Sequence, residues 1–171
     1  MKEESVEILQ KAMDIEEFGY DYYTKLRSAV KDKQGEALLG YLANAEMEHK
    51  ERLGGMFNQL GGKAKETETE IDTLIADILM DEGMERIFRG LMEKSELEKV
   101  DAIEAVKLGI DVEKKSIGFY SANAKKSHEP DVTTLFIELS SMEKEHLELL
   151  EENLRNLKDE GVWYGYIPIL D

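Results

Sequence analysis

The sequence predicts an all-α protein, folded as a four-helix bundle with a long crossover between the second and third helices. Its composition favours helices, because the 171 residues include only 2 prolines and are rich in Glu, Lys, Leu and Ala. Four long segments place apolar residues at helical spacing, and the first two segments match the last two in order. A chain of this length rarely forms more than one domain.

The first pair of predicted helices covers 3–31 and 33–60. The connection between these helices is short, which makes them antiparallel neighbours. Gly61 and Gly62 follow the last apolar position of the second helix, where glycine commonly ends a helix.

The second pair of predicted helices covers 96–126 and 130–160, again with a short connection. Ser95 and Glu98 have the spacing of a capping box, which predicts the start of the third helix. Pro130 suits the first turn of the fourth helix, because a fixed φ and a missing N–H are tolerated there.

The predicted crossover covers 61–95, and apolar spacing within it predicts short helices at 71–79 and 83–94. One long crossover between two helical hairpins is a known bundle topology. We therefore assign residues 1–160 to the bundle. The apolar and aromatic tail, 161–171, is expected to pack on the bundle or on a partner subunit.

The net charge of −16 argues against several classes of function. Such a surface repels nucleic-acid backbones and anionic membranes, and no basic patch offsets it. No apolar run approaches the roughly 20 residues that a membrane-spanning helix needs. No signal peptide is visible, so we expect a cytoplasmic protein. Cysteine is absent, which leaves oxygen and nitrogen atoms as the available metal ligands.

The two halves of the chain match without a gap when they are aligned at an offset of 97 residues. At this offset, Glu16 coincides with Glu113. At this offset a Glu-x-x-His motif on the second helix coincides with one on the fourth helix. The chain is therefore predicted to be a duplicated helical hairpin. The candidate metal ligands in this pattern are Glu16, Glu46, His49, Glu113, Glu143 and His146.

Helical spacing places all six candidate ligands on the core side of their helices, among apolar residues. Burying several carboxylates together is strongly unfavourable without opposing charge, and no Lys or Arg occupies these core positions. Two divalent cations would balance the charge of four carboxylates. Residues three apart share a helix face, so each Glu-x-x-His pair can reach one ion. The ligand set suits two iron or manganese ions, and zinc also fits.

This pattern resembles the di-iron carboxylate proteins of the ferritin-like superfamily, in which two helices supply one Glu each and two supply Glu-x-x-His. The resemblance covers about residues 3–158 and is closest to the rubrerythrin type. It implies that Glu46 and Glu143 bridge two irons, while the other two glutamates are terminal ligands and each iron receives one His.

Two differences from rubrerythrins are visible in the sequence. Ser116 occupies the position at which rubrerythrins carry a further Glu ligand, so the symmetric ligand set is also similar to the catalytic centre of bacterioferritin. The chain also lacks the four cysteines of a rubredoxin domain.

Several further residues have two interpretations each. Tyr23 and Tyr120 match tyrosines that are common beside such sites, where they orient ligands or relay electrons. The other interpretation is that they are ordinary core residues whose hydroxyl groups form hydrogen bonds. Gly19 and Ser116 either let helices approach closely or leave room for oxygen or peroxide. His128 lacks the Glu-x-x-His pattern and is interpreted as an exposed loop residue.

The resemblance implies a non-haem di-iron oxidoreductase that reduces hydrogen peroxide or dioxygen. Its electron donor would be a separate protein, such as a rubredoxin or a flavoprotein, and we expect a homodimer. The alternative is an iron-binding or storage protein with ferroxidase activity. A structural bundle that holds zinc or no metal is the third hypothesis.

Overall fold

The computed structural model describes residues 2–63 and 101–164, and within them the chain forms four helices and no strand. The prediction of an all-α four-helix bundle is confirmed. None of the described helices combines the length and the apolar character needed to cross a membrane. The helices are α1 (Lys2–Ala29), α2 (Lys33–Gln59), α6 (Ala102–Lys126) and α7 (Pro130–Glu160).

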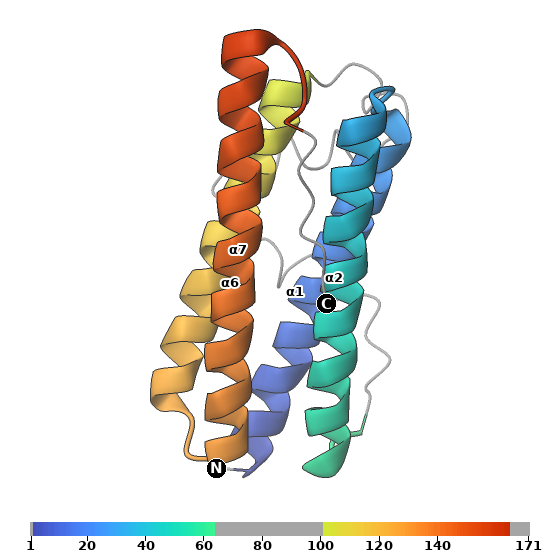
Figure 1. Ribbon diagram of the computed structural model, residues 1–171. Coiled ribbons are helices and arrows are strands. Elements are labelled where there is room, and N and C mark those ends of the chain that lie inside the picture. Colours follow the sequence, from blue (N-terminus) through green and yellow to red (C-terminus); the bar gives the residue numbers. More distant parts are fainter. Residues whose placement is uncertain (1, 64–100, 165–171) are drawn as a thin grey trace, which may run out of the picture.

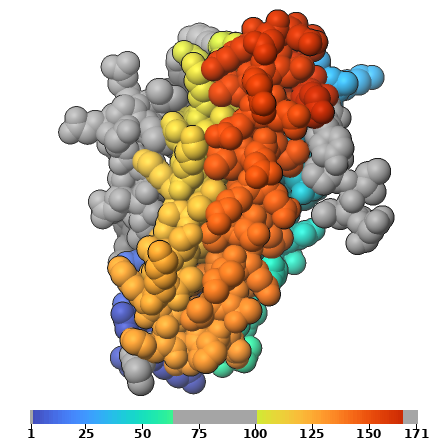
Figure 2. Space-filling model, turned by 60° about the vertical axis from the view of Figure 1, so that its left-hand side comes forward, coloured from blue at the N-terminus to red at the C-terminus, as the bar shows by residue number. Residues whose placement is uncertain are grey.

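The bundle consists of two antiparallel hairpins, one formed by α1 and α2 and the other by α6 and α7 (Figure 1). Figure 2 shows α6 and α7 side by side along the length of one face. The end of α2 and the start of α6 lie at opposite ends of the bundle (Figure 1). This separation of the two ends is compatible with the long crossover that the sequence predicts, whose residues 64–100 lie outside the described part of the chain.

Local signals explain most of the helix boundaries. The Asp32 side chain accepts hydrogen bonds from the N–H groups of Gln34 and Gly35 at 2.9 and 3.0 Å, and so caps the start of α2. Pro130 stands in the first turn of α7, as predicted. Gly161 ends α7 in the left-handed region at φ 73°, which glycine adopts without a steric penalty.

The third helix begins later than the sequence predicted. We expected a start at residue 96, but α6 begins at Ala102, and Asp101 before it has the extended backbone of an N-cap residue. The Asp101 side chain makes no capping hydrogen bond, but its carbonyl accepts the first helical hydrogen bond, from the Ala105 N–H at 3.0 Å. The capping box of Ser95 and Glu98 and the two short helices predicted in the crossover lie outside the described residues.

A polar layer divides the core into two hydrophobic clusters. Along every helix, the candidate ligands fall between residues of one cluster and residues of the other. The cluster nearer the α1–α2 turn includes Leu26, Leu38, Val106, Leu150 and Trp163. The cluster nearer the α6–α7 turn includes Leu9, Leu53, Phe57, Tyr120 and Phe136. Apolar packing on both sides therefore holds the polar layer in place and keeps bulk water from it.

The first residues of the C-terminal tail contact α2 through Trp163 and α7 through hydrogen bonds. Trp163 is only 5% exposed and lies on Gly35 of α2, where a Cβ atom would stand 2.5 Å from the indole ring. The Tyr164 N–H donates to Asn153 Oδ1 at 3.0 Å, and Asn156 Nδ2 donates to the Val162 carbonyl at 2.8 Å. Residues 165–171 of the predicted tail lie outside the described residues.

Replacing Trp163 with alanine is expected to lower the free energy of unfolding by about 3 kcal/mol, because the change removes a buried aromatic ring. Gly35→Ala should also destabilise the protein, since a Cβ at 2.5 Å forces the ring to move. Urea unfolding of both single variants and of the double variant measures the effects. If the ring is the cause, Gly35→Ala has little effect in the chain that already carries Trp163→Ala, and additive losses would contradict this packing.

Candidate metal centre

All six candidate ligands lie in the polar layer at the middle of the bundle. Their exposed fractions range from 0% to 4%, so every one is buried. The donor atoms form two overlapping groups, and within each group all atoms lie within 4.8 Å of one another. One group consists of Glu16, Glu46, His49 and Glu143, and the other of Glu46, Glu113, Glu143 and His146. The structure thus brings together all six residues that the sequence predicted.

The first group is arranged around the ring of His49. Its Nδ1 atom lies 3.1 Å from Glu143 Oε1, 3.2 Å from Glu16 Oε2 and 3.7 Å from Glu46 Oε2. These carboxylates come from three different helices, so one imidazole nitrogen faces oxygen atoms from both hairpins.

The second group is arranged in the same way around the ring of His146. Its Nδ1 atom lies 3.0 Å from Glu143 Oε2, 3.5 Å from Glu46 Oε1 and 3.9 Å from Glu113 Oε2. The rings of His49 and His146 are stacked, with centroids 5.3 Å apart and planes inclined by 15°. Glu46 and Glu143 each direct one oxygen toward each imidazole, which is the placement that a shared, bridging carboxylate requires.

Two tyrosines bond the terminal glutamates of the opposite hairpin. The Tyr23 hydroxyl on α1 donates to Glu113 Oε1 on α6, and the Tyr120 hydroxyl on α6 donates to Glu16 Oε1 on α1. Both tyrosines are fully buried. Each hairpin therefore orients a carboxylate of the other hairpin. The two hydrogen bonds join residues that match each other in the sequence repeat.

The terminal glutamates have pKa values well above their usual 4.5. Burial is the main cause for both Glu16 and Glu113, and the charges of Glu143 and Glu46 add to it. The protonated form of these carboxyl groups is therefore favoured in the metal-free protein.

The pKa values of the central glutamates are lowered, whereas those of the two histidines are raised. Burial acts to raise the pKa of Glu46, but contacts with Glu16 and the two imidazoles outweigh burial and lower it. Contacts with the same imidazoles likewise lower the pKa of Glu143. Burial acts to lower the pKa values of His49 and His146, but contacts with the carboxylates raise both above 6.5.

These directions favour an electrically balanced metal-free cluster. The protonated form is favoured for the two terminal carboxyl groups and the two imidazoles, and the charged form is favoured for the two central carboxylates. Two divalent cations would give the same balance against four carboxylates and two neutral imidazoles. Protons and metal ions are thus alternative ways to satisfy the same buried charges.

Unpaired polar atoms indicate that the cluster fits metal ions better than protons. Among the described residues, the buried side-chain atoms without a hydrogen-bond partner are His49 Nε2, Glu143 Oε2 and His146 Nδ1. The last two lie only 3.0 Å apart but lack hydrogen-bond geometry. An ion with bonds of about 2.1 Å places neighbouring ligands about 3 Å apart, so this spacing suits two ligands of one cation.

Gly19 on α1 makes room for one of the shared carboxylates. A Cβ atom at Gly19 would lie 3.1 Å from Glu46 Cδ and 3.3 Å from Glu46 Oε2, which is closer than ordinary contact. The Glu46 side chain therefore packs directly on the α1 backbone. Ser116, which matches Gly19 in the repeat, is also buried.

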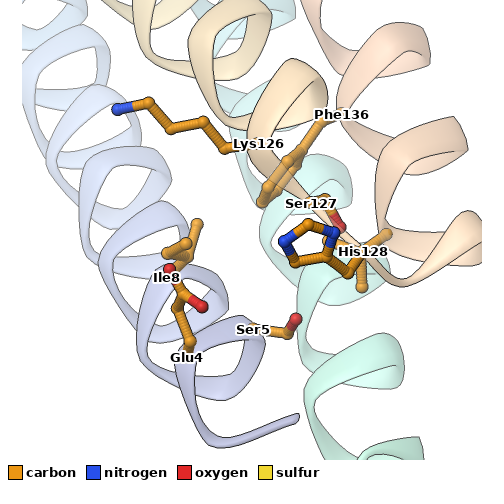
Figure 3. A pocket seen from close by; sticks show the side chains of 8 residues that line it. Glu4, Ser5, Ile8, Lys126, Ser127, His128 and Phe136 are labelled. Atoms are coloured by element: carbon orange, nitrogen blue, oxygen red, sulfur yellow. The ribbon is translucent and has the colours of Figure 1, made fainter. Parts of the chain in front are cut away.

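The remaining polar residues that the sequence singled out lie elsewhere. His128 is exposed in the α6–α7 turn, as expected, and lines a small pocket with Glu4 and Ser5 from the start of α1 (Figure 3). Glu48 and Glu145, the acidic neighbours of the two histidines, are exposed. None of these residues belongs to either donor group.

Sequence reasoning missed four contacts in and around the site. Helical spacing placed Tyr23 and Tyr120 in the core, but it did not show that each bonds the carboxylate of the other hairpin. It also did not reveal that Tyr22 donates to the Ala105 carbonyl at 2.6 Å, nor that Glu46 lies on Gly19. The only available signal was the repeat itself, which aligns these positions but does not pair them across the bundle.

The four-helix fold and the buried carboxylate–histidine cluster define a ferritin-like bundle with a cluster suited to metal. A family model for rubrerythrin matches residues 7–154, which include all six cluster residues. The chain therefore belongs to the rubrerythrin family, and the resemblance identified in the sequence is confirmed. A comparison with curated proteins gave no match.

The metal-free protein is predicted to lose stability as the pH rises above 4.5 and through the neutral range. Glu16, Glu113 and both histidines have raised pKa values in the folded state. Their stabilisation is complete below the unfolded pKa and is lost as the pH rises through the folded pKa. The pKa values of Glu46 and Glu143 are lowered from 4.5, so these carboxylates stabilise the folded state above pH 4.5. Their stabilisation is lost only at lower pH. Urea unfolding with a chelator at several pH values measures this slope.

A matched pair of variants tests the origin of this pH dependence. Glu16→Gln combined with Glu113→Gln mimics the protonated carboxyl groups and should flatten the slope. Glu48→Gln combined with Glu145→Gln also removes two charges, but from exposed positions, and should leave the slope nearly unchanged. Equal slopes in the two double variants would show that the buried glutamates are not responsible.

Proposed function

We propose that this member of the rubrerythrin family is a non-haem di-iron oxidoreductase that reduces hydrogen peroxide or dioxygen. The observation that carries the proposal is the closed set of four carboxylates and two imidazoles, buried between the hairpins with their donor atoms grouped for two ions. Oxygen and nitrogen donors of this kind suit iron and manganese. Iron bound there would supply the two electrons needed to cleave an O–O bond, which the side chains cannot supply.

Each side chain has a role that follows from its position. Glu46 and Glu143 belong to both donor groups and would be the shared ligands. Glu16 and His49 would complete one half of the centre. Glu113 and His146 would complete the other half. Each half would then contain three glutamates and one histidine.

Tyr23 and Tyr120 support the terminal ligands. Burial and the charges of Glu113 and Glu16, respectively, raise the pKa of each tyrosine well above 10.0, so both hydroxyls keep their protons. Each hydroxyl therefore remains a hydrogen-bond donor and holds its carboxylate in one orientation. Such bonds to ligands commonly change metal affinity by about 10- to 100-fold.

The electron donor is proposed to be a separate protein, such as a rubredoxin or a flavoprotein. The sequence contains no cysteine that could hold an iron–sulfur or rubredoxin-type centre. We further propose that the protein acts as a homodimer in the cytoplasm, independently of any membrane or nucleic acid.

The second candidate function is ferroxidation for iron storage. It is favoured by Ser116, which occupies the position of the additional Glu ligand of rubrerythrins and leaves a symmetric set of six donors. Iron storage needs a hollow shell of many subunits, whereas a peroxide reductase can act as a dimer. The mass of the iron-loaded protein in solution therefore separates the two functions.

The purified chain is predicted to bind two iron or manganese ions, and the loss of either shared carboxylate is predicted to abolish both. Glu46→Ala and Glu143→Ala each remove a ligand common to the two donor groups. Glu16→Ala should instead leave one ion, because this residue belongs to a single group. Elemental analysis after anaerobic loading and dialysis measures the stoichiometry.

Exposed glutamates provide the control for this stoichiometry. Glu48→Ala and Glu145→Ala remove a carboxylate two residues after each shared glutamate, and both variants should retain two ions. Retention of two ions by Glu46→Ala or Glu143→Ala would rule out the shared-ligand arrangement.

Hydrogen peroxide is predicted to oxidise the reduced, iron-loaded protein faster than it oxidises ferrous ions in the same buffer. The buried carboxylates hold the two ions close together, so both electrons can reach one O–O bond. Stopped-flow absorbance after anaerobic mixing measures the rate, with Glu46→Ala as the metal-free control. An oxidation rate that matches the buffer control would exclude peroxide reduction, and rapid oxidation by dioxygen alone would favour ferroxidase activity.

A further inference from the structure

Met142 on α7 lies beside a guanidinium group that the sequence repeat does not explain. Arg52 on α2 donates from Nη1 to Met142 Sδ at 3.2 Å and pairs through Nη2 with Glu138 on α7. At the offset of 97 residues, Met142 coincides with Ala45 and Arg52 coincides with Leu149. The contact therefore occurs in one half of the bundle only and is separate from the repeated set of metal ligands.

The contact distinguishes Met142 from the other methionines of the described residues. These are Met13, Met47 and Met56, and all four methionines are half-buried. Met13 and Met56 pack against the hydrophobic cluster nearer the α6–α7 turn. Within the described part of the chain, Met142 is the methionine whose sulfur accepts a hydrogen bond. Because all four side chains are partly accessible, a difference in their reactivity would mainly reflect what surrounds each sulfur.

A thioether reacts with hydrogen peroxide without the help of a metal ion. A lone pair of the sulfur attacks one peroxide oxygen, the O–O bond breaks, and the other oxygen leaves with both electrons of that bond. The proton on the attacked oxygen passes through solvent to the leaving oxygen. The products are methionine sulfoxide and water, so the sulfur is oxidised by two electrons and the peroxide is reduced by two.

The position of Arg52 favours this reaction at Met142. Its N–H group uses one lone pair of the sulfur, and the second lone pair remains for attack on peroxide. Negative charge develops on the leaving oxygen, and a guanidinium held beside the sulfur stabilises that charge. A thioether sulfur is a weak hydrogen-bond acceptor, whereas the sulfoxide has a polar oxygen, so the same guanidinium also binds the product. The ion pair with Glu138 keeps the guanidinium in place.

We propose that Met142 is a site of oxidation by hydrogen peroxide, and that Arg52 makes it the most reactive methionine of the described residues. The reaction needs no metal ion, so the proposal does not rest on the proposed di-iron activity. Met142 directly precedes the shared ligand Glu143. Oxidation therefore introduces a polar group on α7 one residue from the carboxylate–histidine cluster.

Peptide mapping by mass spectrometry tests the proposal on the metal-free protein, treated with hydrogen peroxide in the presence of a chelator. The gain of one oxygen atom is followed over time at each described methionine. Met142 is expected to react about fivefold faster than Met13, Met47 and Met56, a modest effect because Arg52 is partly solvated. In urea-unfolded protein the four rates should become equal, because unfolding separates Met142 from Arg52.

Substitutions of Arg52 test the cause of the difference. Arg52→Gln removes the charge and should lower the rate at Met142 by about fivefold, to that of the other methionines. Arg52→Lys retains a positive charge without the planar fork and should keep part of the advantage. Arg27→Gln is the matched control, since Arg27 forms an exposed ion pair with Glu36 at 3.4 Å on the other hairpin. It should leave the rate at Met142 unchanged.

Oxidation of Met142 no faster than that of the other three methionines would overturn the proposal. So would an unchanged or increased rate at Met142 in Arg52→Gln, because it would show that the guanidinium only covers the sulfur. The chelated protein holds no iron, so these outcomes leave the proposed di-iron activity untouched. Failure of the protein to bind iron would likewise leave the oxidation of Met142 intact.

Discussion

The whole structure depends on one constraint, which is that four carboxylates lie together in an apolar interior. An isolated carboxylate in such surroundings is unfavourable by many kcal/mol, and neighbouring carboxylates increase the penalty. The protein contains no buried Lys or Arg among its described residues to oppose this charge. Only protons or cations can oppose the negative charge. When protons do, the pKa values of Glu16 and Glu113 are raised.

The same constraint explains why the bundle is built from two hairpins. Backbones approach closely within each hairpin and remain farther apart between hairpins, so the side chains of the polar layer fill the space at mid-height. Tyr23 and Tyr120 cross this space in opposite directions and bond carboxylates on the other hairpin. The two hydrophobic clusters above and below close the layer to water. Each hairpin therefore supplies half of the donors and also orients one carboxylate of the other hairpin.

Much of this arrangement was predictable because it follows from local periodicity and from the repeat. The 3.6-residue period placed Glu16, Glu46 and their counterparts on buried faces, and the offset of 97 residues paired the halves. The start of α6 was predicted too early, because the prediction relied on the capping-box spacing of Ser95 and Glu98, whereas the helix begins after Asp101. Contacts across the bundle, such as Tyr120 with Glu16, depend on the packing of the hairpins, which no local pattern encodes.

Exchange of protons for cations would give the metal-free and the metal-bound protein opposite responses to pH. Rising pH removes protons from Glu16, Glu113 and the two imidazoles, and so leaves the metal-free cluster with uncompensated negative charge. The same loss of protons would free the donor atoms for metal, so it would strengthen binding. The metal-free bundle would thus be weakest under the conditions in which it binds cations best. Because binding would add its free energy to folding, a bound metal would offset the penalty that the buried carboxylates impose.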